Sequence, residues 1–92
     1  MNKKEVDREL KKIIATYVAV NDISDINENT NLIEDLDMDS VGLISLIVEI
    51  EKNFSIHFEE NELLVENITN YKNLLKYICE SMETSYEKST IN

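Results

Sequence analysis

The chain has 92 residues, of which 42% are hydrophobic, and a single cysteine, Cys79. These numbers predict one small domain with a modest core, and they exclude a disulfide framework or a thiolate metal cluster. A formal net charge of −10 excludes binding to nucleic acid or anionic membranes, and we expect a cytoplasmic protein with neither signal peptide nor membrane anchor.

The charge is unevenly spread along the chain. Five of the nine basic residues lie within the first twelve positions, whereas residues 13–71 contain thirteen acids against one base, Lys52. This acidic segment would attract basic protein partners. It would equally keep the surface solvated without any partner, and composition alone favours that simpler interpretation.

The first twenty residues predict a helix. Asn2 and Glu5 have the spacing of a capping box. Apolar residues then recur at helical spacing, at Val6, Leu10, Ile13, Ile14 and Tyr17. We expect this helix to run from about residue 3 to residue 20. A polar segment rich in Asn, Asp, Ser and Thr follows, and loops of that length in compact domains are often functional.

The middle of the chain predicts a second long helix, from Asp39 or Ser40 to about Asn53. The next segment, FSIHF (residues 54–58), alternates apolar and polar residues as a strand does. Because no second strand is available to pair with it, we expect this segment to cross the bundle as an extended linker.

The remaining residues predict a short helix near 63–68 and a last long helix capped by Thr69 or Asn70. Residues 81–92 are polar, and we expect them to form a disordered tail. The predicted fold class is therefore all-α, a small four-helix bundle with three long helices and one short helix, over residues 1–80.

The second helix has more apolar surface than one core stripe requires. At about 100° per residue, one arc of the helix has the pattern of a core face, with Leu43, Leu46, Ile47, Ile50 and Phe54. A separate arc carries Val41, Ile44 and Val48. Either this helix is surrounded on nearly all sides, or the second arc is an exposed patch that other proteins contact. The helical wheel leaves both possibilities open.

Three alternating acids, Asp35, Asp37 and Asp39, have the pattern that begins a calcium-binding loop. Such a loop needs glycine at its sixth position and glutamate at its twelfth. Counted from Asp35, these positions hold Ser40 and Leu46. We therefore expect no calcium site of this type, and no bound metal.

Ser40 lies at the predicted beginning of the apolar helix, directly after Asp39, which is a good N-cap. Serine is common in a first helical turn, so one interpretation of Ser40 is purely structural. The other is chemical, because first-turn N–H groups and the helix dipole favour an anion attached there, such as a phosphate ester on Ser40. The neighbouring acids would suit a basic modifying enzyme and its magnesium.

The sequence LIEDLDMDSVGLISLIVEIEKNF (residues 32–54) resembles the phosphopantetheine-attachment region of acyl and peptidyl carrier proteins. In that family an Asp-Ser pair opens the second helix, and the serine receives a 4'-phosphopantetheine arm from coenzyme A. The resemblance continues through FSIHF and ENITNYKNLLKYI (residues 66–78) and covers roughly residues 3–80. An Asp-Ser pair alone is a weak motif, but apolar residues surround it at carrier-like spacing, at Leu32, Leu36, Phe54, Ile56, Ile68 and Leu74.

The resemblance implies a role for each matching residue. Ser40 would be the attachment site, and Asp39 would help to bring magnesium and the phosphopantetheinyl transferase to it. The implied partner-binding residues are Asp35, Asp37, Val41, Ile44, Val48 and Glu49. A monomeric carrier of this kind holds acyl or aminoacyl groups as thioesters. It receives them from a loading enzyme and delivers them to condensing or tailoring enzymes, without catalysis of its own.

Two departures from the family bear on the pathway. Bacterial fatty-acid carriers commonly have acids just after the serine, where this chain has Gly42 and Ser45. The segment LLVENITNYKNLL (residues 63–75) is more similar to carriers of polyketide and nonribosomal peptide assembly. Both favour a free-standing carrier in a specialised pathway, with fatty-acid synthesis and D-alanyl transfer as alternatives. The alternative from a different class is an unmodified acidic helical interaction module, in which Asp-Ser is only a cap.

Overall fold

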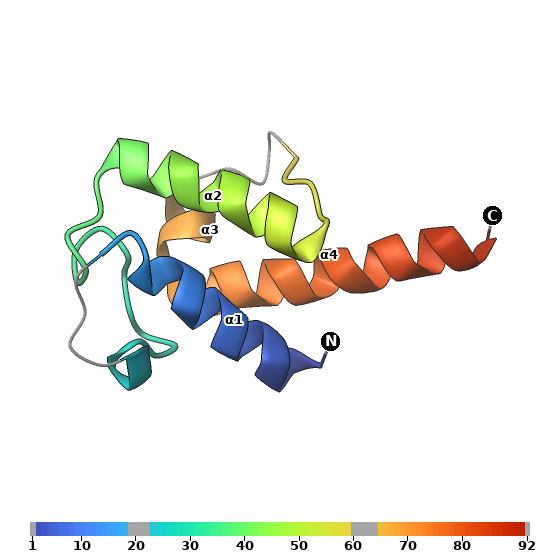
Figure 1. Ribbon diagram of the computed structural model, residues 1–92, viewed down its shortest axis with the longest axis horizontal. Helices are drawn as coiled ribbons and strands as arrows, with labels where there is room; N and C mark the ends of the chain where they lie inside the picture. The colour runs from blue at the N-terminus through green and yellow to red at the C-terminus, as the bar shows by residue number, and fades with distance from the viewer. Residues whose placement is uncertain (1, 19–22, 60–64, 92) are drawn as a thin grey trace.

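The computed structural model describes residues 2–18, 23–59 and 65–91 (Figure 1). Within these ranges it contains no strand. Its elements are helix α1 (Lys3–Ala15), 3₁₀ helix η1 (Ile23–Asp25), and helices α2 (Ser40–Phe54), α3 (Val65–Thr69) and α4 (Tyr71–Ile91). Helix α1 packs against α2 and α4, and the short α3 packs against α4. The predicted all-α fold, with three long helices and one short helix, is confirmed.

Helix α1 begins as predicted and ends earlier. Asn2 Oδ1 accepts a hydrogen bond from the N–H of Glu5 at 2.9 Å, and the N–H of Asn2 donates to Glu5 Oε1 at 3.3 Å. The helix ends at Ala15 rather than near residue 20, because Thr16 donates both its N–H and its hydroxyl to the carbonyl of Ile13, at 3.1 and 2.6 Å. β-Branched residues after this point also disfavour a helix. Residues 19 and 20 lie outside the described ranges.

Polar turns connect η1, which the sequence does not predict, to α2. Their side chains bond to the nearby backbone in the manner of Asx turns. Asn31 Oδ1 accepts from the N–H groups of Ile33 and Glu34 at 2.9 and 2.8 Å, and Asp35 Oδ2 accepts from the N–H of Asn31 at 2.7 Å. The loop before α2 therefore has a defined local structure although it lacks regular elements.

Two backbone hydrogen bonds attach this loop to the junction of α3 and α4. The N–H of Leu32 donates to the carbonyl of Thr69 at 2.7 Å, and the N–H of Tyr71 donates to the carbonyl of Thr30 at 3.0 Å. The side chains of Ile26 and Leu32 are fully buried, so the same loop is also anchored in the core. These contacts fix the position from which α2 begins.

The core lies between the three long helices. Helix α2 contributes the five residues predicted for its core arc: Leu43, Leu46, Ile47, Ile50 and Phe54. Helix α1 contributes Val6, Leu10 and Ile14. The first turns of α4 contribute Tyr71, Leu74, Leu75 and Ile78. Burial of these apolar side chains is the main favourable term that holds α2 in place.

The segment after α2 has no regular secondary structure through residue 59, so it is a linker rather than a strand. Ser55 ends the helix with a left-handed φ of 54°. Ile56 and Phe58 are buried, and His57 between them is exposed. Glu51 Oε2 accepts a hydrogen bond from the N–H of Phe58 at 2.9 Å and lies 3.1 Å from His57 Nδ1. Glu51 thus connects this segment to the last turns of α2.

Helix α4 is longer than predicted. Asn70 caps it, as expected, by accepting from the N–H of Asn73 at 3.0 Å. The helix then continues to Ile91, across residues expected to form a disordered tail, and its end extends past the bundle (Figure 1). No glycine or proline occurs between residues 71 and 91 to end it. None of the helices in the described part of the chain is long and apolar enough to cross a membrane.

Candidate functional site

The N-terminus of α2 is capped by Asp39 and begins at Ser40. Asp39 has an extended backbone, and its Oδ1 accepts a hydrogen bond from the N–H of Gly42 at 2.7 Å. Ser40 is exposed, and its hydroxyl makes no hydrogen bond with any residue that the structure describes. Because Asp39 already caps the helix, Ser40 has no capping role to perform and its hydroxyl is available for chemistry.

The residue before the cap is a buried anchor. Met38 is 3% exposed, and its N–H donates to the carbonyl of Leu32 at 3.1 Å. Asp37, one residue earlier, has a left-handed φ of 55°, which is uncommon for a residue with a side chain. Sequence reasoning did not single out Met38, although one apolar residue between two aspartates was its signal.

The absence of a side chain at Gly42 leaves space for the capping carboxylate of Asp39. A methyl group at this position would lie 3.1 Å from Asp39 Oδ1 and 3.2 Å from Met38 Cγ. A larger residue would therefore push against both the capping carboxylate and the buried anchor. The glycine that departs from the fatty-acid pattern thus has a local structural reason.

The electrostatics of this helix end suit an attached anion. The Asp39 carboxylate engages the N–H of Gly42, and the first turn of α2 contains no further acidic side chain, so the other first-turn N–H groups and the positive end of the helix dipole still favour an anion. A phosphate ester on the Ser40 oxygen would lie in this favourable field. The exposed oxygen and the open first turn therefore fit a phosphate-linked group.

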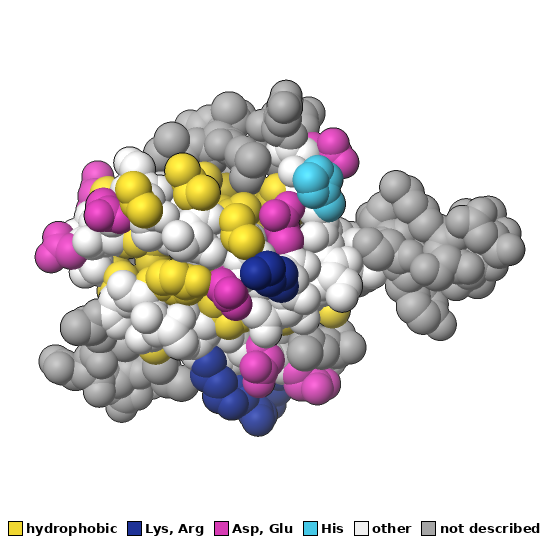
Figure 2. All heavy atoms as spheres, turned by 45° about the horizontal axis from the view of Figure 1, so that its top comes forward, with side chains coloured by type: hydrophobic (Ala, Val, Ile, Leu, Met, Phe, Trp, Pro, Cys, Tyr) yellow, Lys and Arg dark blue, Asp and Glu magenta, His cyan; other side chains and the backbone are white. Residues whose placement is uncertain are grey.

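The apolar arc that the helical wheel left undecided is exposed. Val41, Ile44 and Val48 are 73%, 65% and 43% exposed, and we call them the outer face of α2. Figure 2 shows hydrophobic side chains gathered on the surface of this side of the molecule, with acidic side chains beside them. Tyr17 adjoins α2, since its hydroxyl donates to the carbonyl of Ser45 at 3.4 Å. Because these three side chains are not part of the core, packing within the described fold does not account for their apolar character.

The predicted acidic contacts differ in their availability. Asp35 and Asp37 are exposed, just before the site. Glu49 is half-buried, and its Oε2 accepts a hydrogen bond from Asn53 Nδ2 at 3.2 Å. Within the described ranges, no three side chains of His, Cys, Asp or Glu are placed to hold a metal ion.

Comparisons with known proteins agree with this geometry. A family model described as "Phosphopantetheine attachment site" matches residues 8–78. The acyl carrier protein of Brachyspira hyodysenteriae is 33% identical over 72 residues, which are 78% of this chain and 90% of that protein. The acyl carrier protein of Chlamydia caviae is 36% identical over 73 residues, which are 79% of this chain and 91% of that protein.

A solved structure shares the fold. The acyl carrier protein from Enterococcus faecalis has a TM-score of 0.74 to this chain and covers 88% of it, with 99% of its own length matched. Its sequence identity is 22%, so this likeness concerns the arrangement of the helices alone.

Proposed function

The chain belongs to the acyl carrier protein family, which bears a covalent 4'-phosphopantetheine arm, and from this membership we propose that Ser40 is the residue that carries the arm. One observation supports the proposal above others. The Ser40 hydroxyl is exposed at the first residue of α2 and has no partner among the described residues, while Asp39 performs the capping.

The residues around Ser40 have distinct parts in the proposed attachment. Ser40 Oγ would form the ester bond to the phosphorus of coenzyme A that carries the pantetheine. The pyrophosphate bond of coenzyme A would break, adenosine 3',5'-bisphosphate would leave, and the serine proton would pass to the modifying enzyme. The first-turn N–H groups of α2 favour the negative phosphate that results. Asp39 caps the helix through Oδ1, and its other carboxylate oxygen would be the one to bind the magnesium of the transferase. The arm supplies a terminal thiol that holds the cargo as a thioester.

The outer face of α2 is the surface that we propose for partner enzymes. Its apolar side chains are exposed and do not pack in the core, at Val41, Ile44 and Val48. Exposed apolar patches commonly mark interaction sites. Asp35 and Asp37 flank this face before the helix and would contact basic residues on the partner. The transferase, a loading enzyme and a condensing enzyme would approach it in turn.

We propose an acyl cargo delivered within a specialised pathway such as polyketide assembly, with nonribosomal peptide assembly as the pathway that an aminoacyl cargo would indicate. The support is the first turn of α2, which carries no acid, so partners meet the residues next to Ser40 through apolar contacts. The relatives are named acyl carrier proteins without further qualification, which favours acyl over aminoacyl cargo and keeps fatty-acid synthesis as the second candidate. Loading assays with an acyl transferase and an amino-acid-activating enzyme would separate these cargo classes.

The attachment site is tested by mass spectrometry. The purified chain is incubated with coenzyme A, magnesium and a broad-specificity phosphopantetheinyl transferase, and its intact mass is recorded beside Ser40→Ala and Ser45→Ala. Ser45 is a matched control because it lies on the same helix. We expect one arm on the native chain and on Ser45→Ala, and none on Ser40→Ala. No gain in a folded native sample, when a known carrier is modified in parallel, would favour the unmodified interaction module.

A further inference from the structure

Four large hydrophobic side chains are exposed in the described part of the chain, and all four lie on or beside α2. Three of them form the outer face of α2. The fourth, Tyr17, is 37% exposed and lies in the turn after α1. Its hydroxyl is 3.4 Å from the carbonyl oxygen of Ser45, in the second turn of α2. The function proposed above gives Tyr17 no role.

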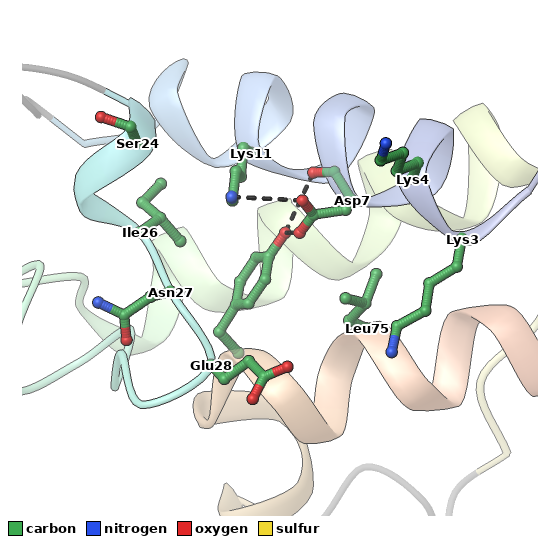
Figure 3. Close-up of a pocket in the computed structure, with 10 residues that line it drawn as sticks. Lys3, Lys4, Asp7, Lys11, Ser24, Ile26, Asn27, Glu28 and Leu75 are labelled. Atoms are coloured by element: carbon green, nitrogen blue, oxygen red, sulfur yellow. Dashed lines mark hydrogen bonds and ion pairs between the residues drawn. The ribbon is translucent and has the colours of Figure 1, made fainter.

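Tyr17 differs from the other tyrosines whose side chains the structure describes. Tyr71 is 1% exposed, and its hydroxyl donates to Asp7 Oδ1 at 2.6 Å (Figure 3). The ring of Tyr77 stacks on the ring of Phe58, with 4.6 Å between the ring centroids. Tyr17 has no ring contact of this kind with a described residue. Its ring therefore contributes less to packing than the other two rings do, and more of it is open to a partner.

The hydroxyl of Tyr17 is held only weakly. Its distance of 3.4 Å to the Ser45 oxygen is longer than the usual distance between two hydrogen-bonded oxygens, about 2.5–3.0 Å. The Ser45 carbonyl also belongs to the hydrogen-bond ladder of α2, where it accepts from the N–H four residues later. Because the hydroxyl is exposed, it can turn to a better acceptor on another protein without leaving a buried polar group unpaired.

Tyr17 lies close enough to Ser40 to contact an enzyme that modifies it. Ser45 follows Ser40 by five residues of α2, about 7.5 Å along the helix axis. A protein–protein interface of modest to standard size covers roughly 600–800 Å² on each partner, which corresponds to a disc of about 14–16 Å radius. An enzyme centred on the Ser40 hydroxyl therefore also covers Tyr17. Lys52, about 18 Å along the same axis, lies beyond this radius.

Tyr17 widens the outer face of α2 on one flank. At about 100° per residue, Ser45 follows Val41 by about 40° around the helix, on the side away from Ile44. Because Tyr17 meets α2 at Ser45, Val41 lies between Tyr17 and Ile44. A partner on the outer face thus meets an aromatic ring on one flank and aliphatic side chains on the other. Tyrosine is among the residues enriched where an interface gains most of its binding free energy.

We propose that Tyr17 is a recognition residue for the phosphopantetheinyl transferase that modifies this chain. Its ring packs against an apolar surface of the enzyme, and its hydroxyl donates to an acceptor there. This inference rests on the function proposed above, because it takes Ser40 as the attachment site. Tyr17 takes no part in the chemical step. It contributes to the affinity of the complex, so its loss raises KM and leaves kcat unchanged.

Steady-state kinetics of arm transfer test this role. The full-length chain without its arm is the varied substrate of a broad-specificity phosphopantetheinyl transferase, with saturating coenzyme A and magnesium. We expect Tyr17→Ala to raise KM about fivefold with kcat unchanged. Tyr17→Phe keeps the ring and loses the hydroxyl, so it should raise KM only about twofold. The control Lys52→Gln should behave as the native chain does. An unchanged KM in Tyr17→Ala, or an equal rise in Lys52→Gln, would overturn the proposal.

A competition experiment measures binding without the chemical step. Ser40→Ala has no hydroxyl to accept the arm and keeps the rest of the surface, so it should inhibit arm transfer to the native chain competitively. We expect the double variant Ser40→Ala/Tyr17→Ala to have an inhibition constant about fivefold higher than that of Ser40→Ala. Equal inhibition constants would mean that the transferase does not contact Tyr17.

A further variant separates contact with the enzyme from packing within the chain. Tyr17→Gln keeps a side chain long enough to cover α2 and lacks the ring, so urea denaturation should show near-native stability while KM rises about fivefold. A native KM in this variant would contradict the proposal. The two proposals also fail in different ways. If the native chain and Tyr17→Ala gain the arm at Ser40 with the same KM, only the role of Tyr17 is wrong. If the native chain gains no arm, both proposals are wrong.

Discussion

Two side-chain hydroxyl groups at helix N-termini differ in their surroundings: that of Ser40 at the beginning of α2, and that of Tyr71 at the beginning of α4, where α3 meets α4. At the junction, Tyr71 is 1% exposed and its hydroxyl lies within hydrogen-bonding distance of two oxygens of Asp7. At α2, the Ser40 hydroxyl is exposed and has no partner among the described residues. The fold is held together where polar groups are buried and satisfied. The proposed reactive group is kept outside that network, so it can be modified without disturbing the fold.

The largest expected difference in the free energy of unfolding is between substitutions on the buried face and on the outer face of α2. Leu46 is fully buried and Ile44 is 65% exposed. We expect Leu46→Ala to lower the free energy of unfolding by about 2–5 kcal/mol, because it leaves a cavity in the core. Ile44→Ala should change it by less than about 0.5 kcal/mol, as surface substitutions usually do. Urea denaturation followed by circular dichroism measures both.

The same pair of variants separates folding from partner recognition. Ile44→Ala should slow transfer of the arm by the phosphopantetheinyl transferase while the protein remains as stable as the native chain. A matched substitution of an exposed residue on the same helix, Lys52→Gln, should leave the rate of transfer unchanged. A large loss of stability in Ile44→Ala would mean that the outer face packs against something in solution.

Removal of the Tyr71 hydroxyl tests how much the buried, hydrogen-bonded hydroxyl contributes to the stability of the fold. Tyr71→Phe keeps the buried ring and loses the bond to Asp7, and we expect a cost of about 1.5 kcal/mol, as for a hydrogen bond to a charged group. Burial, and then the hydrogen bond to Asp7, raise the pKa of the Tyr71 hydroxyl well above its ordinary value. The folded state therefore holds this proton more tightly than the unfolded state does.

A pH dependence follows from that raised pKa. The stabilising contribution is complete below the unfolded pKa of about 10 and is lost as the pH rises above it toward the folded pKa. We expect the native chain to lose stability above about pH 10 more steeply than Tyr71→Phe does, in urea titrations at each pH. Parallel declines of the two proteins would mean that the unfolded state protects this hydroxyl equally.

The sequence predicted best the features that depend on local pattern. The core arc of α2, the capping box at Asn2 and the cap at Asn70 follow from helical spacing and side-chain chemistry, and the structure contains all three. The exposure of Val41 could not be predicted, because a helical wheel does not show which of two apolar arcs meets the rest of the fold. The end of α1 was missed because Thr16 bonds to the carbonyl of Ile13, a competition that periodicity does not show.

The site itself was predictable only in part. The Asp39–Ser40 pair at a helix start was visible in the sequence, as was the resemblance to carrier proteins. The N–H of Met38 bonds to the carbonyl of Leu32, and the N–H of Leu32 bonds in turn to the carbonyl of Thr69, a contact between residues far apart in the chain that no local pattern indicates. The Asp7–Tyr71 bond joins residues separated by 64 positions, and no local pattern indicates it.

A pair of variants at Asp39 separates its two proposed roles. Asp39→Asn keeps an oxygen that can accept from the N–H of Gly42, so the free energy of unfolding should remain near that of the native chain. Asp39→Ala removes the acceptor and should cost about 1 kcal/mol. If the charge of Asp39 helps to bring magnesium, both variants should be modified slowly at Ser40. A normal rate for Asp39→Asn would restrict the residue to capping.

Substitutions of Asp37 have the smallest expected effect on the free energy of unfolding. They also separate the effect of its backbone conformation from the effect of its charge. Its φ of 55° is strained for a residue with a Cβ and free of strain for glycine. Asp37→Gly should therefore raise the free energy of unfolding by about 0.5 kcal/mol, and Asp37→Ala should lower it by about 1 kcal/mol. Both remove the same carboxylate, so their difference in urea denaturation reports the backbone alone. Any slowing of arm transfer that the two share reports the charge, and equal stabilities would show that the left-handed turn relaxes without cost.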